Sequence, residues 1–206
     1  MELVLIRHAL PLRVSAVDGP ADPRLARDGV TQAALLAEYL DGDPITAVYS
    51  SPLRRAVETA APLARRRGLE IRTSDGLAEW DRNAAEYVPI EELRASGDPR
   101  WAAMVAGEWI SDEDPEAFTA RVVEAVDAII AGHPGEMVVA VCHGGVINTY
   151  LGHVLGRAGN GTFFAPNYTS IHRVAASRGG HRQVMTLNET AHLRGRGLPI
   201  GLFDRG

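Results

Sequence analysis

The sequence predicts an α/β fold, a three-layer sandwich with a mainly parallel sheet. Two patterns predict this class. Short continuous apolar runs, which are typical of buried parallel strands, alternate with segments whose apolar residues recur at helical spacing. Breakers such as Asp41-Gly42-Asp43-Pro44 and Gly132-His133-Pro134-Gly135 separate these segments. The 206 residues are enough for one good core, so we expect a single domain over 1–206.

The expected elements follow one another along the chain. Strands are predicted at Glu2–Ile6, Ile45–Tyr49, Leu69–Arg72, Met137–Val141, Thr169–Val174 and Gln183–Leu187. Helices are predicted at Ala26–Leu40, Leu53–Arg67, Pro115–Ala131 and Gly145–Leu155. Arg178-Gly179-Gly180 reads as a turn, so we expect the last two strands to pair antiparallel at an edge of the sheet.

Residues 74–114 fit neither pattern. We interpret them as an insertion over the carboxyl ends of the strands, where a lid or a substrate pocket would form. Its tryptophans, Trp80, Trp101 and Trp109, could line a pocket for an apolar substrate, although packing within the insertion is the simpler interpretation. We expect Gly195–Gly206 to form a flexible tail.

Composition excludes several classes of protein. All 21 basic residues are arginine, and the absence of lysine excludes a P-loop NTPase, a Schiff-base enzyme and a Ser-Lys hydrolase. The net charge of −5 gives no support for a nucleic-acid partner. Cys142 is the single cysteine, which excludes an intramolecular disulfide and a multi-cysteine zinc site. No apolar run reaches signal-peptide or membrane-span length, so we expect a cytoplasmic protein with no membrane association.

Two histidines stand where predicted strands end. Leu3–Ile6 runs into Arg7-His8, and Val138–Cys142 runs into His143-Gly144-Gly145. The carboxyl ends of parallel strands form the crevice in which α/β proteins bind ligands. The glycine pair would let a helix N-terminus approach an anion. The pattern indicates a site that holds and attacks a phosphoryl group.

Four separated segments carry a family resemblance. They are Arg7-His8, Ser50–Ala60, Leu77-Ala78-Glu79 and His143-Gly144-Gly145, and Leu25–Ala33 fits the same pattern as a first helix. In this order they resemble the histidine phosphatase superfamily, also called phosphoglycerate mutase-like, over nearly the whole chain. The resemblance implies a phosphoglycerate mutase-like fold and phosphatase chemistry that needs no metal and no cofactor.

The resemblance also implies roles for individual residues. His8 matches the family's nucleophile, which becomes phosphohistidine. Arg7, Arg55 and His143 match its phosphate-binding groups, and we place Gly144 beside them as a substrate-binding residue. Arg55 fits the family's Leu-x-Arg-Ala spacing, with Arg54 as the alternative.

Glu79 matches the family's proton donor, and Asp81 and Glu86 are the nearby alternatives. Elementary chemistry supports these roles. Guanidinium groups bind phosphate oxygens in two-point fashion, and they lower the pKa of a neighbouring histidine so that it stays a neutral nucleophile. An alkoxide leaving group needs a proton, which a carboxyl group with a raised pKa can supply.

The sequence therefore predicts a phosphomonoester hydrolase acting through His8 on a phosphorylated small molecule. A phosphoglycerate mutase is an alternative, but Val14 stands where mutases tend to carry asparagine, and the chain is short for a mutase. A phosphoprotein (phosphohistidine) phosphatase is another, disfavoured because such enzymes tend to lack the acid at Glu79. A non-catalytic phospholigand-binding domain is a third. An edge strand makes a homodimer plausible.

Four further residues have other interpretations. Cys142 cannot serve a cysteine phosphatase, which needs Cys-x5-Arg, because residue 148 is asparagine. We interpret Cys142 as a core residue and His133 as a loop residue. Asn188 and His192, four residues apart on a possible helical face, suggest a structural cap or a tail contact.

Overall fold

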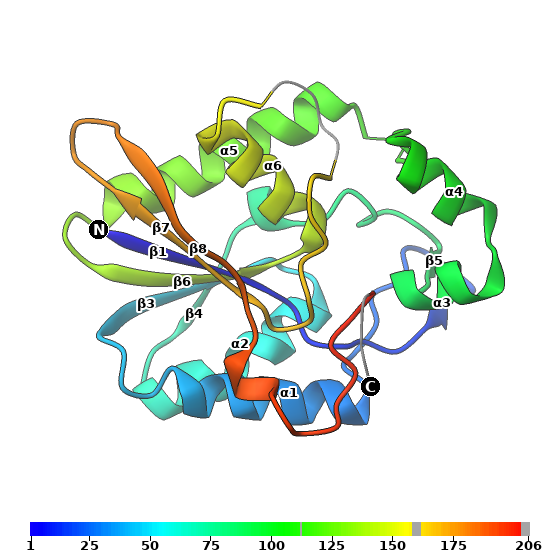
Figure 1. The fold of residues 1–206 in the computed structure, drawn as a ribbon, viewed down its shortest axis with the longest axis horizontal. Coiled ribbons are helices and arrows are strands. Elements are labelled where there is room, and N and C mark those ends of the chain that lie inside the picture. The colour runs from blue at the N-terminus through cyan, green and yellow to red at the C-terminus, as the bar shows by residue number, and fades with distance from the viewer. Residues whose placement is uncertain (112, 158–161, 203–206) are drawn as a thin grey trace.

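The computed structural model describes residues 1–111, 113–157 and 162–202, and a six-stranded sheet forms its centre (Figure 1). The strand order is β4-β3-β6-β1-β7-β8. Strands β4, β3, β6 and β1 run parallel, whereas β7 is antiparallel to both of its neighbours. The strands are β1 (Glu2–Arg7), β3 (Ile45–Ser50), β4 (Ile71–Thr73), β6 (Met137–Cys142), β7 (Ile171–Ala176) and β8 (Arg182–Glu189).

Strand β1 shows why the central strands are apolar throughout. Side chains alternate between the two faces of a strand. Leu3 and Leu5 accordingly enter one core cluster, while Val4 and Ile6 enter another on the opposite face. All four are fully buried. A strand covered on both faces has no polar side, which explains the unbroken apolar run.

Helices cover both faces of the sheet and complete the three layers (Figure 1). Helices α1 (Arg27–Tyr39) and α2 (Arg54–Arg67) pack against each other on one face. Helices α5 (Pro115–Gly132) and α6 (Gly144–Val154) cover the other. The side chain of Asp114 accepts hydrogen bonds from two backbone N–H groups in the first turn of α5, which satisfies otherwise unpaired donors.

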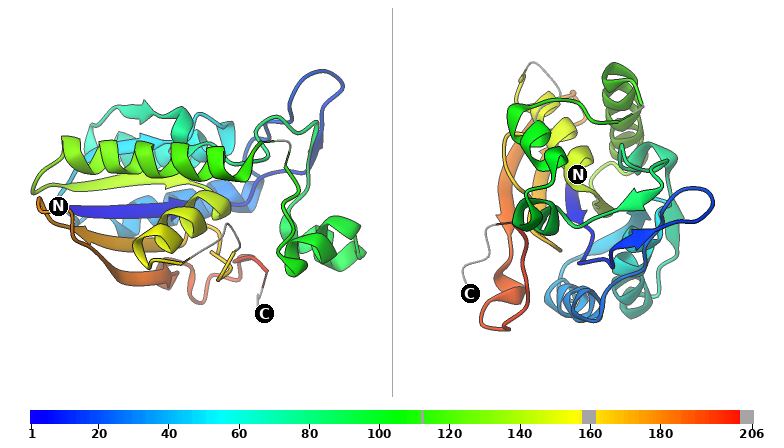
Figure 2. Two further views of the ribbon diagram at one scale, coloured as in Figure 1. Left: turned by 90° about the horizontal axis from the view of Figure 1, so that it is seen from above. Right: turned by 90° about the vertical axis from the view of Figure 1, so that its right-hand side faces the viewer.

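Most of the remaining elements lie beyond the carboxyl ends of the parallel strands. Helices α3 (Ile90–Ser96) and α4 (Pro99–Ala106) stand apart from the layered body (Figures 1 and 2). A small ribbon joins β2 (Val14–Ser15) to β5 (Glu86–Tyr87). Short 3-10 turns lie at η1 (Asp75–Leu77) and η2 (Ala191–Leu193). Residues 74–114 thus sit over the strand ends.

The sequence-based predictions hold for the sheet and its covering helices. The α/β class and the mainly parallel sheet are confirmed, and β7 and β8 form the expected antiparallel pair. Each predicted element is present, with ends within two residues of the expected ones. The ribbon β2–β5 and the helices α3 and α4 were not predicted.

The C-terminal segment differs from the flexible tail that we expected. Its described part, residues 195–202, makes hydrogen bonds to the body of the protein. The carbonyl of Ile200 accepts from the backbone of Tyr168 at 2.8 Å, and that of Leu202 accepts from Arg94 at 2.9 Å. Residues 203–206 lie outside the described part of the chain.

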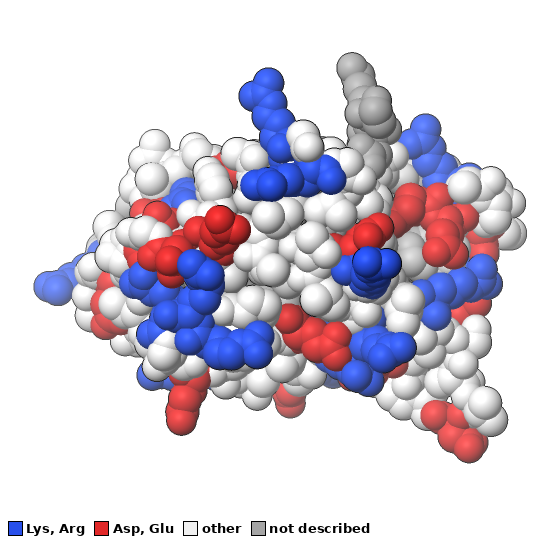
Figure 3. Space-filling model, turned by 90° about the horizontal axis from the view of Figure 1, so that it is seen from below, with Lys and Arg blue, Asp and Glu red and all other residues white. Residues whose placement is uncertain are grey.

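The surface agrees with the expectation from the charge balance. Figure 3 shows one face of the molecule, on which groups of arginines alternate with groups of carboxylates. Arg173 in β7 and Arg182 in β8 form ion pairs with acidic residues. No helix in the described ranges is long and apolar enough to cross a membrane.

Candidate active site

The two strand-end histidines lie side by side. Strands β1 and β6 are parallel neighbours whose register pairs Arg7 with Cys142, so the residues that follow, His8 and His143, leave the sheet together. The backbone N–H of His8 donates to the carbonyl of Cys142 at 2.9 Å. The two imidazole rings are 5.1 Å apart between centroids. The register of a parallel pair therefore builds the centre of the site.

His8 is held as a neutral ring with a defined tautomer. Its Nδ1 lies 2.8 Å from the carbonyl oxygen of Ala9. A carbonyl only accepts, so Nδ1 carries the proton and Nε2 keeps its lone pair. Burial, followed by the charges of Arg55 and Arg7, holds the pKa of His8 well below its ordinary value. The result is an uncharged imidazole beside two cations.

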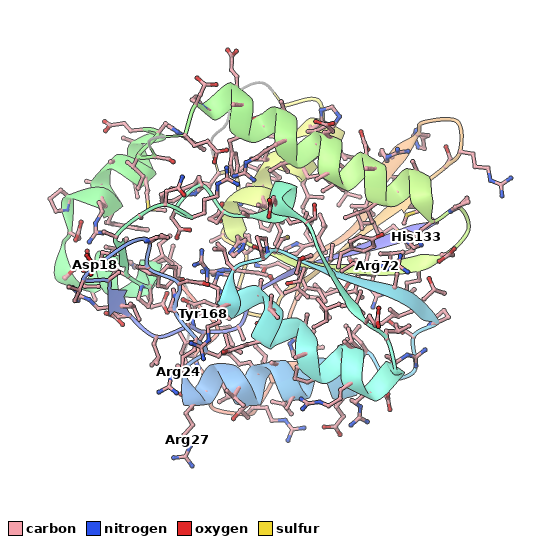
Figure 4. The ribbon with its side chains drawn as sticks, turned by 180° about the vertical axis from the view of Figure 1, so that it is seen from behind. Asp18, Arg24, Arg27, Arg72, His133 and Tyr168 are labelled. Carbon is pink, nitrogen blue, oxygen red and sulfur yellow. The ribbon has the colours of Figure 1, made fainter. Side chains whose placement is uncertain are left out.

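Arg7 is positioned from the loop that precedes β7. Its guanidinium donates to the carbonyl of Pro166 at 2.7 Å and lies over the ring of Tyr168, 4.2 Å from the centroid. Tyr168 lies inside the molecule, well away from Arg72 and His133 (Figure 4), and its ring is also 6.0 Å from that of His8. A buried aromatic face thus orients the arginine.

Arg55 enters the site from the first turn of α2. It is almost fully buried, donates to Asp81 at 2.7 Å and lies over the ring of Tyr87. Burial opposes its charge, but Asp81 and other neighbours outweigh burial and raise the pKa of Arg55. Arg54 instead pairs with Glu58 at the surface, with 55% of its side chain exposed. The structure favours Arg55 over the alternative.

His143 is fully buried behind His8. Its Nε2 lies 2.7 Å from the hydroxyl of Ser51, which also accepts from the backbone N–H of Leu53. Burial, followed by Arg55 and His8, holds the pKa of His143 well below its ordinary value. His143 precedes α6, whose first two residues are glycines. Because the Ser51 hydroxyl occupies Nε2 of His143, the other ring nitrogen, Nδ1, is available to hydrogen-bond a ligand.

Glu79 approaches α6 closely. Its carboxylate oxygens accept from the backbone of Gly145 at 2.7 Å and of Trp80 at 3.1 Å. A Cβ at Gly145 would overlap Glu79 Oε1, so only glycine permits this approach, whereas a Cβ at Gly144 would meet nothing. Burial, followed by the charge of Asp81, raises the pKa of Glu79 to about 7 against the two N–H donors. Such a carboxyl group exchanges protons near neutral pH.

A cavity of about 370 Å³ opens onto these groups. Arg7, His8, Arg55, Glu79 and Gly144 all line it. His143 is not among the lining residues, but its ring is next to that of His8, which lines the cavity. The structure therefore brings together the residues singled out from the sequence. The side chains of four of them and the backbone of Gly144 line the cavity, and His143 lies next to His8.

Three polar atoms at this site have no partner. Of the five buried side-chain atoms without a hydrogen bond in the described residues, three belong to neighbours of His8, namely Arg7 Nε, Arg55 Nε and His143 Nδ1. Unsatisfied buried polar atoms are costly and rare. Their concentration around one neutral histidine indicates a ligand rich in acceptor oxygens.

Residues with alternative interpretations lie elsewhere or act structurally. Glu86 pairs with Arg13 and Arg100 and does not line the cavity. Cys142 is buried in β6, where burial raises the pKa of its thiol. His133 ends α5 and hydrogen-bonds to Tyr49 and Glu136, close to Arg72 and far from Tyr168 (Figure 4).

Asn188 and His192 do not share a helix. Asn188 is in β8 with a φ of 56°, and its amide holds the backbone at Asn167 and Ala165. His192 lies in η2 and hydrogen-bonds to the hydroxyl of Thr169 at 2.9 Å. Both support the loop that carries Tyr168.

The tryptophans divide between the two interpretations. Trp80 and Trp101 line the cavity. Trp109 packs on Phe118 at 5.4 Å and on Trp80 at 6.2 Å, and it lines a second, adjoining cavity of about 280 Å³. Packing and pocket lining therefore both occur.

Sequence reasoning missed the supporting residues. Ser51 stands within the segment that carries the resemblance, but a serine before proline has no signal of its own. Asp81 was considered only as an acid, whereas it pairs with Arg55. Tyr87 and Tyr168, which stack on the two arginines, come from segments without periodicity.

The fold and the site together define a phosphate-handling α/β protein, and comparison with known proteins specifies its family. The sequence profile of the histidine phosphatase superfamily (branch 1) matches residues 3–190. The chain belongs to this superfamily.

Individual relatives are more distant. Phosphoserine phosphatase 1 of Hydrogenobacter thermophilus is 35% identical over 95 residues, so the match spans 45% of this chain and 45% of that protein. A probable phosphoglycerate mutase of Yersinia pestis is 29% identical over 162 residues, 76% of this chain and 75% of the relative.

Solved structures share the fold. A phosphoserine phosphatase of Entamoeba histolytica, in complex with 3-phosphoglyceric acid, superimposes with a TM-score of 0.74 at 24% identity, over 93% of this chain and 98% of that one. A mycobacterial glucosyl-3-phosphoglycerate phosphatase gives 0.72 at 24% identity, over 92% and 99%. The phosphoglycerate mutase-like fold predicted from the sequence is thereby confirmed.

Proposed function

We propose that this protein is a phosphomonoester hydrolase that works without a metal, through a phosphohistidine intermediate on His8. One observation carries the proposal: a neutral histidine with a free Nε2 is surrounded by three buried donors that lack partners. A phosphate group supplies acceptor oxygens for those donors and an electrophile for that nitrogen. Phosphatases among the relatives and the family membership support the same activity.

The phosphoryl group would lie between Arg7, Arg55 and His143. Two guanidinium groups neutralise its oxygens, and oppositely charged pairs of this kind give strong hydrogen bonds. In this role the hydroxyl of Ser51 would donate to His143 Nε2, so that Nδ1 would carry a proton for a phosphoryl oxygen. The loose transition state of phosphoryl transfer makes such positioning and charge stabilisation the main source of catalysis.

In the first step, the Nε2 lone pair of His8 forms a P–N bond as the P–O bond to the alcohol breaks. The electron pair of the broken bond stays on the alcohol oxygen, which takes the proton of Glu79. A carboxyl group with a pKa of about 7 holds that proton in a large fraction of molecules at neutral pH. The products are phospho-His8, the free alcohol and the Glu79 carboxylate.

In the second step, water attacks the phosphorus of phospho-His8. Its oxygen forms the new P–O bond, and the Glu79 carboxylate takes its proton. The P–N bond breaks with its electron pair returning to Nε2. Inorganic phosphate leaves, and both His8 and Glu79 recover their starting states.

Hydrolysis of p-nitrophenyl phosphate in the presence of EDTA tests the proposal. The wild type should turn over, and His8→Ala should lose roughly 10⁴-fold or more of the rate because no nucleophile remains. His181→Ala, at an exposed turn between β7 and β8, is the matched control and should retain full activity. Turnover of similar size by His8→Ala would refute the assignment of the nucleophile.

A further inference from the structure

The cavity has two ends of different chemistry. Its charged lining residues, among those described, are Arg7, Arg55, Glu79 and Asp81, and all four lie at the end that holds His8. Arg55 and Asp81 already pair with each other, and Glu79 already accepts two backbone N–H groups. The rest of the described lining carries no charged side chain.

The uncharged polar side chains of the lining include Tyr87, Asn148 and Thr162, and none of them supplies a charge. Asn148 lines the cavity, but its amide nitrogen donates to the carbonyls of Gly144 and Phe164. Its amide oxygen accepts from the backbone of Phe163 and Phe164. The Asn148 side chain is thus committed to holding the loop in place, with no donor left for a substrate carboxylate.

Helix α4 presents apolar side chains to this cavity. No residue of α4 is buried in the protein, although most of its eight residues are apolar. Trp101, Met104 and Val105 line the cavity, and Trp101 packs against none of the hydrophobic core clusters. Apolar helix faces normally bury themselves against a core. The apolar face of α4 is instead available to a ligand that enters the cavity.

Aromatic and aliphatic groups from other segments face the same space. Trp80 follows Glu79, and Phe163 and Phe164 lie on the loop that Asn148 holds. The two phenylalanine rings are 5.0 Å apart. Because these apolar groups line the cavity together with Glu79, the alcohol portion of a substrate would contact apolar surface directly after its ester oxygen.

We infer that the substrate is a phosphomonoester of an uncharged, apolar alcohol, with an aliphatic or aromatic group that contacts Trp80, Trp101 and Met104. This inference rests on the proposed function, since it names the leaving group of the same reaction. Burial of apolar area favours such an alcohol. A leaving group that carries a carboxylate or an ammonium would lose hydration there without gaining a partner of opposite charge.

A series of linear alkyl phosphates tests the inference, because ethyl, butyl and hexyl phosphate differ in apolar area but hardly in leaving-group basicity. We expect kcat/KM to rise roughly threefold for each added methylene within the cavity. Phosphoserine and 3-phosphoglycerate should be roughly a hundredfold poorer than hexyl phosphate. A flat or inverted series, or a preference for phosphoserine, overturns the inference while hydrolysis of p-nitrophenyl phosphate still upholds the proposed function.

Two variants locate the effect. Trp101→Ala and Met104→Ala should each lower kcat/KM for hexyl phosphate several-fold and leave kcat/KM for ethyl phosphate nearly unchanged. Met185→Ala, on the exposed side of β8 with 52% of the residue accessible, should leave the whole series unchanged. An undiminished rise in both α4 variants would overturn the assigned contacts. Absence of turnover with every ester, p-nitrophenyl phosphate included, would refute the proposed function itself.

Discussion

The two ends of the cavity are built by different means. At the phosphate end, strand termini and the first turns of α2 and α6 deliver His8, Arg55 and Gly144, all anchored in the central sheet or its covering helices. At the other end, short helices outside the three layers deliver Trp101 and Met104 (Figure 2). The difference teaches that the groups proposed for the chemistry are fixed by the central sheet and its helices, whereas the groups proposed for selectivity come from a segment outside those layers.

After the loss of His8, the largest expected effect on the phosphate end comes from Arg55. Arg55→Gln removes a buried cation from the transferring phosphoryl group and should lower kcat/KM by about 10³-fold for every ester. Arg54→Gln, one residue earlier and paired with Glu58 at the surface, should change it by less than twofold. Steady-state kinetics with thermal melts of both variants check this. Equal losses in the two variants would remove the distinction between them.

Glu79→Gln should separate leaving groups. We expect kcat/KM for alkyl phosphates to fall by roughly 10²-fold or more, because their alkoxides need a proton, and by less than tenfold for p-nitrophenyl phosphate. Glu86→Gln is the control, since Glu86 pairs with surface arginines outside the cavity. Equal slowing of both kinds of ester by Glu79→Gln would show that Glu79 is not the acid.

The pH profile should report the same group. Burial and Asp81 raise the pKa of Glu79 to about 7, so kcat/KM for alkyl phosphates should fall about tenfold per pH unit above 7, as the acid loses its proton. The pKa of His8 lies well below its ordinary value, so protonation of His8 should not limit the rate near pH 6. Glu79→Gln should abolish the alkaline fall. An unchanged fall in that variant would assign it to another group.

The smallest effect concerns the contact between α6 and the Glu79 loop. Gly145→Ala places a methyl group against Glu79 and Trp80, and overpacking of this kind costs about 1–3 kcal/mol, or a melting temperature lowered by roughly 3–10 °C. Gly144→Ala meets no neighbour and should leave the melting temperature within about 2 °C of the wild type. Similar melting temperatures for the two variants would show that the close approach is not required.

Sequence patterns predicted that the two strand-end histidines lie together, for physical reasons. His8 and His143 follow apolar runs, and in a parallel sheet such runs end at one edge, so their proximity follows from strand pairing. A glycine is required at position 145 because the Glu79 carboxylate occupies the space that a side chain would need.

The sequence did not predict the apolar end of the cavity. In α4 the apolar side chains face a cavity instead of a core, over a helix of only eight residues, which leaves no clear period. Asp81 and Ser51 act through partners distant in the sequence, and no local signal reveals such pairings. Gly195–Gly206 was expected to form a flexible tail, yet backbone carbonyls in its described part, residues 195–202, accept hydrogen bonds from the body of the protein.

Direct detection of the covalent intermediate tests the central claim. The protein would be mixed with substrate, quenched in alkali within the first turnover and digested with trypsin for mass spectrometry. We predict phosphate on the peptide 8–13, whose single histidine is His8, and none on that peptide once the wild type has exhausted the substrate. Phosphate on the peptide that contains His143, or rapid wild-type turnover with no labelled peptide, would contradict the account.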